Sequence, residues 1–254
     1  MKVAVVQHDI AWERPLVTQD RLRPLVGQAA SAGARLVVLT EMYATGFSMA
    51  TGRITEETGG PNEAFCVARA REHGVWVAAS VAQREPRDTG RPRNVGLLVA
   101  PDGAVHRYAK IHPFSYSEED KHYEAGKDTL TVDVEGVRVS LLICYDLRFA
   151  DTFWGLAGGT DCYVVVASWP EARREHWRAL LVARAIENQA YVVGANRVGA
   201  APKGLTYSGD SRIVDPLGVV LAEAAYVETV LTAEVDPARV AQVRRELPFF
   251  ADRT

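Results

Sequence analysis

Short apolar runs alternate with polar, glycine-containing segments along most of the chain. Residues 3–7, 36–39 and 137–143 are rich in valine, leucine and isoleucine, which predicts buried β-strands. Residues 16–32 and 173–189 have apolar positions at helical spacing instead, which predicts amphipathic helices. Further strands are predicted at 75–81, 95–100, 104–108, 129–134, 161–167, 191–196, 211–215, 219–222 and 227–234, further helices at 62–73, 147–157 and 237–246, and a long polar loop at 110–128.

The predicted elements occur in the same order twice. Residues 3–108 and 137–223 each read strand, helix, strand, helix, strand and then a final hairpin. Both hairpin turns, at 101–103 and 215–218, contain proline and glycine. This repetition predicts two similar halves that build one layered α/β domain over residues 1–254.

Chemically reactive side chains stand where three of the predicted strands end. Glu41 and Cys144 follow buried strands, and Lys110 follows the first hairpin. Because open α/β sheets bind ligands at the carboxyl ends of their strands, we expect these three side chains to share one crevice. A thiol becomes a nucleophile when a base takes its proton, and an ammonium group stabilises the oxyanion that results.

Each of these three residues also has an ordinary structural interpretation. Free cysteine is among the most frequently buried residue types, and a charged residue at a strand end is often only the first solvated position. Cys66 and Cys162 lie within apolar surroundings and are interpreted as structural. The polar residues that directly follow Cys144 favour a reactive position for that thiol.

Composition and charge exclude several other classes of protein. The formal net charge is −3 without a basic stripe, which argues against nucleic-acid binding as the main function. No apolar run approaches the roughly 18 residues of a membrane-spanning helix, and the amino terminus lacks the pattern of a signal peptide. Three cysteines fit a reducing cytoplasm, and the six histidines form no HxH or HxxxH pair that would indicate a metal site.

Three motifs carry a family resemblance. TEMYATGF contains Glu41, YAKIHPF contains Lys110 and CYDLRFA contains Cys144. In this order they resemble the Glu-Lys-Cys pattern of the nitrilase superfamily of carbon–nitrogen hydrolases. The resemblance continues through SWPEARREHWRALLVARAIENQAYVVGANRVG and YSGDSRIVDPLG, so it covers nearly the whole chain. It implies a four-layer α-β-β-α sandwich of the nitrilase type.

The resemblance also implies catalytic roles. Glu41 is expected to be the general base and Cys144 the nucleophile, while Lys110 stabilises the oxyanion. A second glutamate of the family lies in the loop after the lysine, where Glu119 is favoured and Glu118 is the competing assignment. No cofactor or metal is expected, because side chains supply the nucleophile, the base and the electrostatic stabilisation.

The residues that follow the nucleophile are expected to support it. The backbone N–H of Tyr145 is expected to contribute to the oxyanion site. Arg148 is expected to pair with a carboxylate such as Asp146 and so to stabilise the turn that carries the thiol.

The substrate expected from the resemblance is a small carboxamide with an anionic end. The segments HPFSYSEEDKHYEAG and ARAIENQAYVVGANRVG most resemble the omega-amidase branch, which hydrolyses 2-oxoglutaramate and 2-oxosuccinamate. Arg173 is the candidate for binding the anionic end. Tyr43, Phe114 and Trp169 are expected to form aromatic walls of the pocket.

Other functions stay open at this point. The same three reactive residues suit an N-carbamoyl compound, a nitrile or another amide such as deaminated glutathione. The alternative outside enzymology is that the chain is a catalytically silent subunit that only binds other proteins. The resemblance further implies a homodimer or larger assembly, formed through the helix after Arg173 and the carboxyl-terminal segment.

Overall fold

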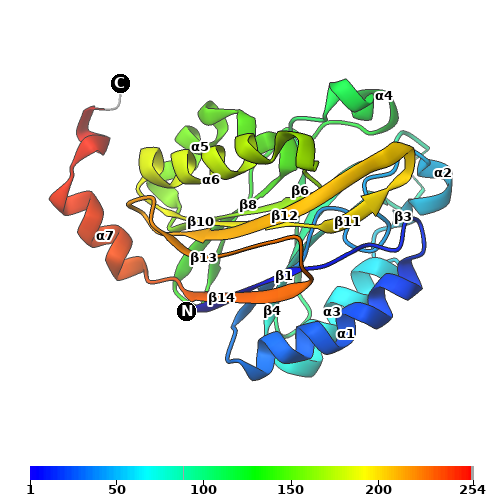
Figure 1. Cartoon of the computed structure of the whole chain (residues 1–254), viewed down its shortest axis with the longest axis horizontal. Helices are drawn as coiled ribbons and strands as arrows, with labels where there is room; N and C mark the ends of the chain where they lie inside the picture. The colour runs from blue at the N-terminus through cyan, green and yellow to red at the C-terminus, as the bar shows by residue number, and fades with distance from the viewer. Residues whose placement is uncertain (88, 253–254) are drawn as a thin grey trace.

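Two β-sheets pack face to face, and helices cover the outer face of each sheet (Figure 1). The computed structural model describes residues 1–87 and 89–252. Helices α1 (Pro15–Ser31) and α3 (Pro61–His73) lie against the first sheet, whereas α6 (Arg174–Asn188) lies against the second, with α5 (Ala150–Leu156) beside it. The expected four-layer α-β-β-α sandwich is therefore confirmed.

In the described part of the chain each sheet has seven strands. The first sheet contains β1 (Lys2–Gln7), β2 (Leu36–Val38), β3 (Glu56–Glu57), β4 (Trp76–Arg84), β5 (Arg93–Val99), β6 (Val105–Ala109) and β14 (Thr229–Glu234). The second contains β7 (Thr131–Val134), β8 (Val137–Ile143), β9 (Cys162–Ala167), β10 (Tyr191–Asn196), β11 (Val198–Ala201), β12 (Leu205–Val214) and β13 (Val220–Ala225). The main path through the first sheet is β14-β1-β2-β4-β5-β6, and the path through the second is β11-β12-β10-β9-β8-β7.

The duplication predicted from the sequence is visible in the strand order. The path β1-β2-β4-β5-β6 in the first sheet corresponds to β8-β9-β10-β12-β13 in the second. Each first strand also gains one outer neighbour, β14 beside β1 and β7 beside β8. Between the sheets, β5 packs on β8 and β12 packs on β1, which are equivalent contacts in the two halves.

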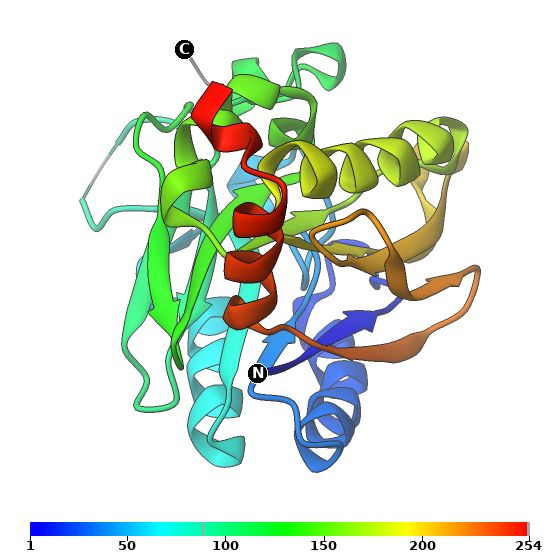
Figure 2. The same ribbon diagram turned by 90° about the vertical axis from the view of Figure 1, so that its left-hand side faces the viewer.

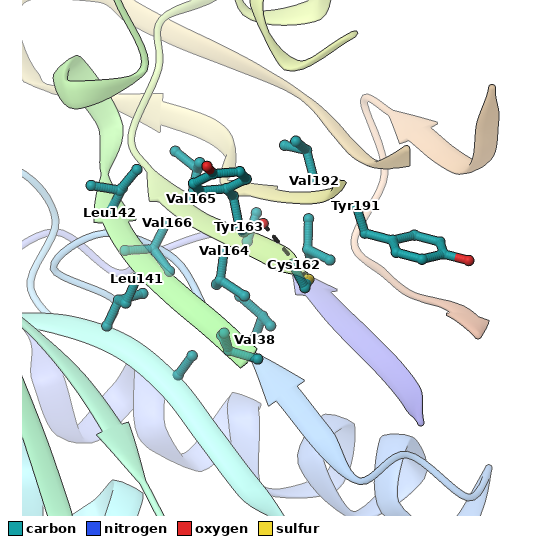
Figure 3. Packing of buried hydrophobic residues seen from close by; sticks show 14 of the residues in the cluster. Val38, Leu141, Leu142, Cys162, Tyr163, Val164, Val165, Val166, Tyr191 and Val192 are labelled. Atoms are coloured by element: carbon teal, nitrogen blue, oxygen red, sulfur yellow. Dashed lines mark hydrogen bonds between the residues drawn. The ribbon is translucent and has the colours of Figure 1, made fainter. Parts of the chain in front are cut away.

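The core lies mainly between the two sheets. Figure 3 shows Leu141 and Val164 of the second sheet on the side that faces Val38 of the first. Gly96 on β5 allows the close approach, because a Cβ atom there would lie 2.9 Å from a methyl group of Leu141. Burial of these β-branched and leucine side chains is the main stabilising term for the sandwich.

The differences between prediction and structure include two predicted segments and one strand that was not predicted. The polar loop at 110–128 contains a 3₁₀ turn at Ser115–Ser117 and helix α4 (Glu119–His122). The helix predicted at 147–157 is divided into a 3₁₀ turn at Cys144–Arg148 and α5, because the extended backbone of Phe149 interrupts it. Strand β11 was not predicted, since its sequence, VGAA, has neither strong alternation nor length.

The carboxyl-terminal helix α7 (Pro237–Glu246) runs in front of the ends of both sheets (Figure 2). Asp236 caps it by accepting a hydrogen bond from the N–H of Ala238. Arg244 donates to the carbonyl oxygens of Ala157 and Thr160, which fixes the helix to the second half. Within residues 1–87 and 89–252, no helix combines the length and apolar character needed to cross a membrane.

Leu141→Ala tests the packing between the sheets. Because Leu141 is fully buried, its truncation is expected to lower the free energy of unfolding by about 2 to 5 kcal/mol. The matched control is Leu16→Ala, at a side chain that is 71% exposed, where the change is expected to stay within about 0.5 kcal/mol. Chemical denaturation measures both, and equal effects of the two variants would contradict the packing described.

Candidate active site

Three strand ends bring an acid, an amine and a thiol together between the sheets. Glu41 follows β2, Lys110 follows β6 and Cys144 follows β8. The Nζ atom of Lys110 lies 2.9 Å from Oε1 of Glu41, and both side chains are buried. The thiol of Cys144 interacts with both charged groups and is half-buried. The structure thus places the three reactive residues predicted from the sequence in one site.

Lys110 is held between two carboxylates. Its Nζ atom donates to Glu119 Oε2 at 2.8 Å in addition to Glu41. Asn94, at the start of β5, donates to Oε1 of Glu41 at 2.8 Å and to Oε1 of Glu119 at 3.2 Å. Glu118 is exposed and pairs with Lys121 instead, so Glu119 is the glutamate that lies in the site.

The second oxygen of Glu41 has its own partner. Ser168, directly after β9, donates its backbone N–H to Glu41 Oε2 at 2.9 Å. The hydroxyl of Ser168 donates to the carbonyl oxygen of Glu41 at 3.2 Å. These bonds and those from Lys110 and Asn94 fix the orientation of the carboxylate toward the thiol.

Burial and charge set the protonation of the site. Burial and the neighbouring Glu41 raise the pKa of the Cys144 thiol well above its usual range, and Lys110 offsets this only in part. Burial alone would lower the pKa of Lys110, but the carboxylates of Glu119 and Glu41 raise it well above the usual value. Burial and Glu41 raise the pKa of Glu119. At neutral pH the site therefore holds a thiol and an ammonium group.

The turn that carries Cys144 is strained and firmly anchored. Cys144 has a φ of 46°, in the left-handed region that few residues other than glycine adopt. Buried Asp146 accepts hydrogen bonds from the backbone N–H of Ile143 at 2.9 Å and from the hydroxyl of Tyr108 at 2.7 Å. It also accepts from the backbone N–H of His112 at 3.0 Å. These bonds hold the nucleophile turn in place.

A cavity of about 170 Å³ opens beside the thiol. Its lining is mostly aromatic or aliphatic, with two arginines and no acidic residue among the described residues. The lining consists of Phe47, Phe114, Tyr116, Ser117, Cys144, Tyr145, Arg148, Ser168, Trp169, Pro170, Arg173, Leu205 and Tyr207. The cavity thus suits a small molecule whose reacting carbon lies near sulfur and whose other end is anionic.

Phe114, Trp169 and Arg173 line this cavity as expected, but Tyr43 does not. The hydroxyl of Tyr43 donates to the carbonyl oxygen of Asn62, and its ring stacks on Phe65 beneath the first sheet. The left-handed backbone of Met42, with φ of 43°, breaks the alternation of the chain. Tyr43 therefore belongs to the core under α1 and α3, and its prediction as a pocket wall was wrong.

The expected pairing of Arg148 with Asp146 was also wrong. The oxygens of Asp146 are occupied by the donors of the nucleophile turn. Arg148 instead turns toward the cavity, where its guanidinium lies 4.7 Å from the centre of the Trp169 ring. Tyr145 and Asp146 lie on the turn at the positions expected from the sequence.

Sequence reasoning missed several residues of the site, among them Phe47, Asn94, Ser168 and Tyr207. A signal existed for Ser168, because it is the first polar residue after the buried strand β9. Asn94 is a polar residue that enters an apolar strand and is almost fully buried. Phe47 and Tyr207 gave no signal beyond being aromatic.

Comparisons with known proteins extend over the whole fold. The model of the carbon-nitrogen hydrolase family matches residues 2–245. Omega-amidase YafV of Escherichia coli (strain K12) is 38% identical over 256 residues, which cover 99% of this chain and 96% of that protein. The 2-oxoglutaramate amidase of Bacillus subtilis (strain 168) is 33% identical and covers 98% of this chain and 96% of its own length.

A solved structure agrees with these sequence relationships. XC1258 from Xanthomonas campestris is described as a CN-hydrolase superfamily protein with an arsenic adduct in its active site. It superposes with a TM-score of 0.93 at 33% identity, covering 100% of this chain and 97% of that one. The similarity therefore includes every strand end that contributes to the site.

Asp146→Asn tests how the nucleophile turn is held. The carboxylate of Asp146 now accepts hydrogen bonds from the backbone N–H groups of His112 and Ile143. In asparagine one of the two oxygens is replaced by an NH2 group, which is a donor and cannot accept such a bond. We expect the free energy of unfolding to fall by about 1 to 3 kcal/mol, as for other buried groups that lose their partners. Asp151→Asn, on the exposed start of α5, is the control and should leave the thermal midpoint unchanged. Equal midpoints for both variants would contradict the anchoring role.

Proposed function

The chain belongs to the carbon–nitrogen hydrolase family, and we propose that it is an omega-amidase. In this proposal it hydrolyses the terminal carboxamide of a short 2-oxo acid, such as 2-oxoglutaramate or 2-oxosuccinamate, to the acid and ammonia. The observation that carries the proposal is the buried contact of Glu41 and Lys110 beside the thiol of Cys144, at the base of a cavity with arginine side chains. Relatives named omega-amidase and 2-oxoglutaramate amidase support the choice of substrate.

In the acylation step the thiol attacks the carboxamide carbon. The raised pKa of Cys144 keeps the sulfur protonated at rest, so Glu41 takes the proton as the bond to carbon forms. The oxyanion receives hydrogen bonds from the Nζ atom of Lys110 and the backbone N–H of Tyr145. Glu41 then donates the proton to the leaving nitrogen, and ammonia departs from a thioester on Cys144.

In the deacylation step water replaces the sulfur. Glu41 takes a proton from the water as it attacks the thioester, and the same two donors stabilise the second oxyanion. The carbon–sulfur bond then breaks, the thiol regains its proton and the carboxylic acid leaves. Glu119 acts throughout as a positioning residue, because its carboxylate holds Lys110 charged and oriented.

The cavity favours an anionic substrate. Arg173 lies on its wall, with the guanidinium 5.4 Å from the centre of the Phe114 ring, and no carboxylate pairs with it in the described part of the chain. In the proposed complex it binds the carboxylate of the substrate, and Phe114 and Trp169 contact the carbon chain. No step of this chemistry requires a cofactor.

A substrate screen separates omega-amidase activity from the alternatives. Ammonia release is measured from 2-oxoglutaramate, an N-carbamoyl amino acid, a simple nitrile and deaminated glutathione. The proposal expects 2-oxoglutaramate to give the highest kcat/KM. No turnover of the oxo-amide, together with turnover of another compound, would exclude this substrate and leave the hydrolase chemistry intact.

Cys144→Ala tests the nucleophile. Without the sulfur no thioester forms, so kcat is expected to fall by roughly 1,000-fold or more. Cys162→Ala is the matched control, because Cys162 is a fully buried thiol outside the site, and its variant should keep most of the activity. Mass spectrometry of the quenched wild-type reaction should show the acyl group on Cys144. Retained turnover in Cys144→Ala would favour the alternative of a non-catalytic thiol and contradict the mechanism.

We propose further that the protein is a homodimer in a reducing cytoplasm. The three cysteines are free, which agrees with such a compartment. Exposed apolar residues lie at the end of α6, in the turn before β13 and at the start of β13, where Ile186, Leu217, Val219 and Leu221 are 43 to 55% exposed. A second copy would cover these residues, and the family resemblance supports that choice.

Ile186→Glu tests the assembly. A buried charge in a dimer contact is costly, so this variant is expected to shift the protein toward monomer in sedimentation velocity. Leu16→Glu, on the exposed start of α1, is the control and should leave the molar mass unchanged. A monomeric wild-type protein would contradict the dimer directly.

A further inference from the structure

Two guanidinium groups, those of Arg148 and Arg173, line the same cavity as the thiol. Arg148 follows the nucleophile turn, whereas Arg173 precedes α6, so the two come from separate segments of the second half. Burial, together with the positive charge of Arg173, lowers the pKa of Arg148. Both side chains end in a guanidinium group, which is a cation.

This pair of like charges is uncompensated. In residues 1–87 and 89–252 no carboxylate forms an ion pair with either side chain, and no acid lines the cavity. Several other arginines of the second half have acidic partners, as Arg174 has in Asp210 and Arg184 in Glu187. Two unpaired cations in one small cavity repel one another until an anion binds between them.

Both guanidinium groups are held in place without an acid. Arg148 lies 4.7 Å from the centre of the Trp169 ring, and its Nη2 atom is 3.1 Å from Nδ1 of His176. Arg173 lies 5.4 Å from the centre of the Phe114 ring and 5.8 Å from that of Tyr116. Aromatic faces attract the cations and leave their N–H groups available to a ligand.

We propose that Arg148 is a specificity-determining residue that, together with Arg173, selects 2-oxo acid amides and excludes 2-amino acid amides. This inference rests on the proposed function. The carboxylate and the adjacent carbonyl oxygen of a 2-oxo acid are both hydrogen-bond acceptors, so they satisfy two guanidinium groups at once. Glutamine carries an ammonium group at the same carbon, which two cations repel and no carboxylate of the cavity wall accepts.

The test compares two substrates that differ only at carbon 2. Ammonia release from 2-oxoglutaramate and from L-glutamine is measured for the wild type and for Arg148→Met. The ratio of kcat/KM, oxo-amide over glutamine, is expected to fall by at least about 30-fold in the variant. An unchanged ratio overturns the proposal, even if both activities decline.

Two further variants separate charge from shape and from folding. Arg148→Lys keeps the charge but loses the planar pair of donors, so the ratio is expected to fall less than in Arg148→Met. Arg21→Met, on the exposed face of α1, is the control and should leave the ratio unchanged. Circular dichroism checks folding, and Arg148→Gln replaces Arg148→Met if that variant does not fold.

Failure of the proposed function gives a different result. If the wild type turns over neither amide, or if Cys144→Ala retains turnover, the hydrolase mechanism itself is contradicted. If the wild type hydrolyses 2-oxoglutaramate and the ratio does not depend on Arg148, only the present inference is overturned.

Discussion

The buried ammonium of Lys110, held between two carboxylates, is the interaction on which the site depends. Removing three charged groups from water is costly, and the attraction within the cluster offsets that cost only when the geometry is close. Here Nζ lies 2.9 Å from Glu41 and 2.8 Å from Glu119. Loss of either carboxylate would leave the buried charges unbalanced. The cluster therefore keeps the end of β2, which carries Glu41, close to the end of β6, which carries Lys110.

The duplicated fold provides these constraints. The ends of β2 and β6 come from the first half, and the ends of β8 and β9 come from the second. Glu41 bridges the halves, because Lys110 bonds to one of its oxygens and Ser168 to the other. The cluster is therefore both a catalytic device in the proposed mechanism and a contact that joins the two sheets.

Sequence reasoning succeeded where a feature of the structure depends on a local pattern of residues along the chain. The apolar runs gave the strands, their repetition gave the two halves, and polar residues at strand ends gave Glu41 and Cys144. It failed where side-chain direction decides, as at Tyr43, because a left-handed residue before it reverses the alternation. It also failed at Arg148, since hydrogen bonds from distant residues occupy Asp146 and no local pattern reveals them.

The distribution of charge along the cavity gives the site a direction. Beside Cys144 two carboxylates surround one ammonium group, and this surrounding favours a neutral or partly positive group such as a carboxamide. Two guanidinium groups line the cavity without an acid, so the cavity itself favours an anion. A substrate with an amide at one end and a carboxylate at the other fits in only one orientation, with its reacting carbon beside Cys144. The charge pattern thus orients the substrate in the proposed mechanism. The aromatic walls add apolar contact with the carbon chain, which does not distinguish one end of the substrate from the other.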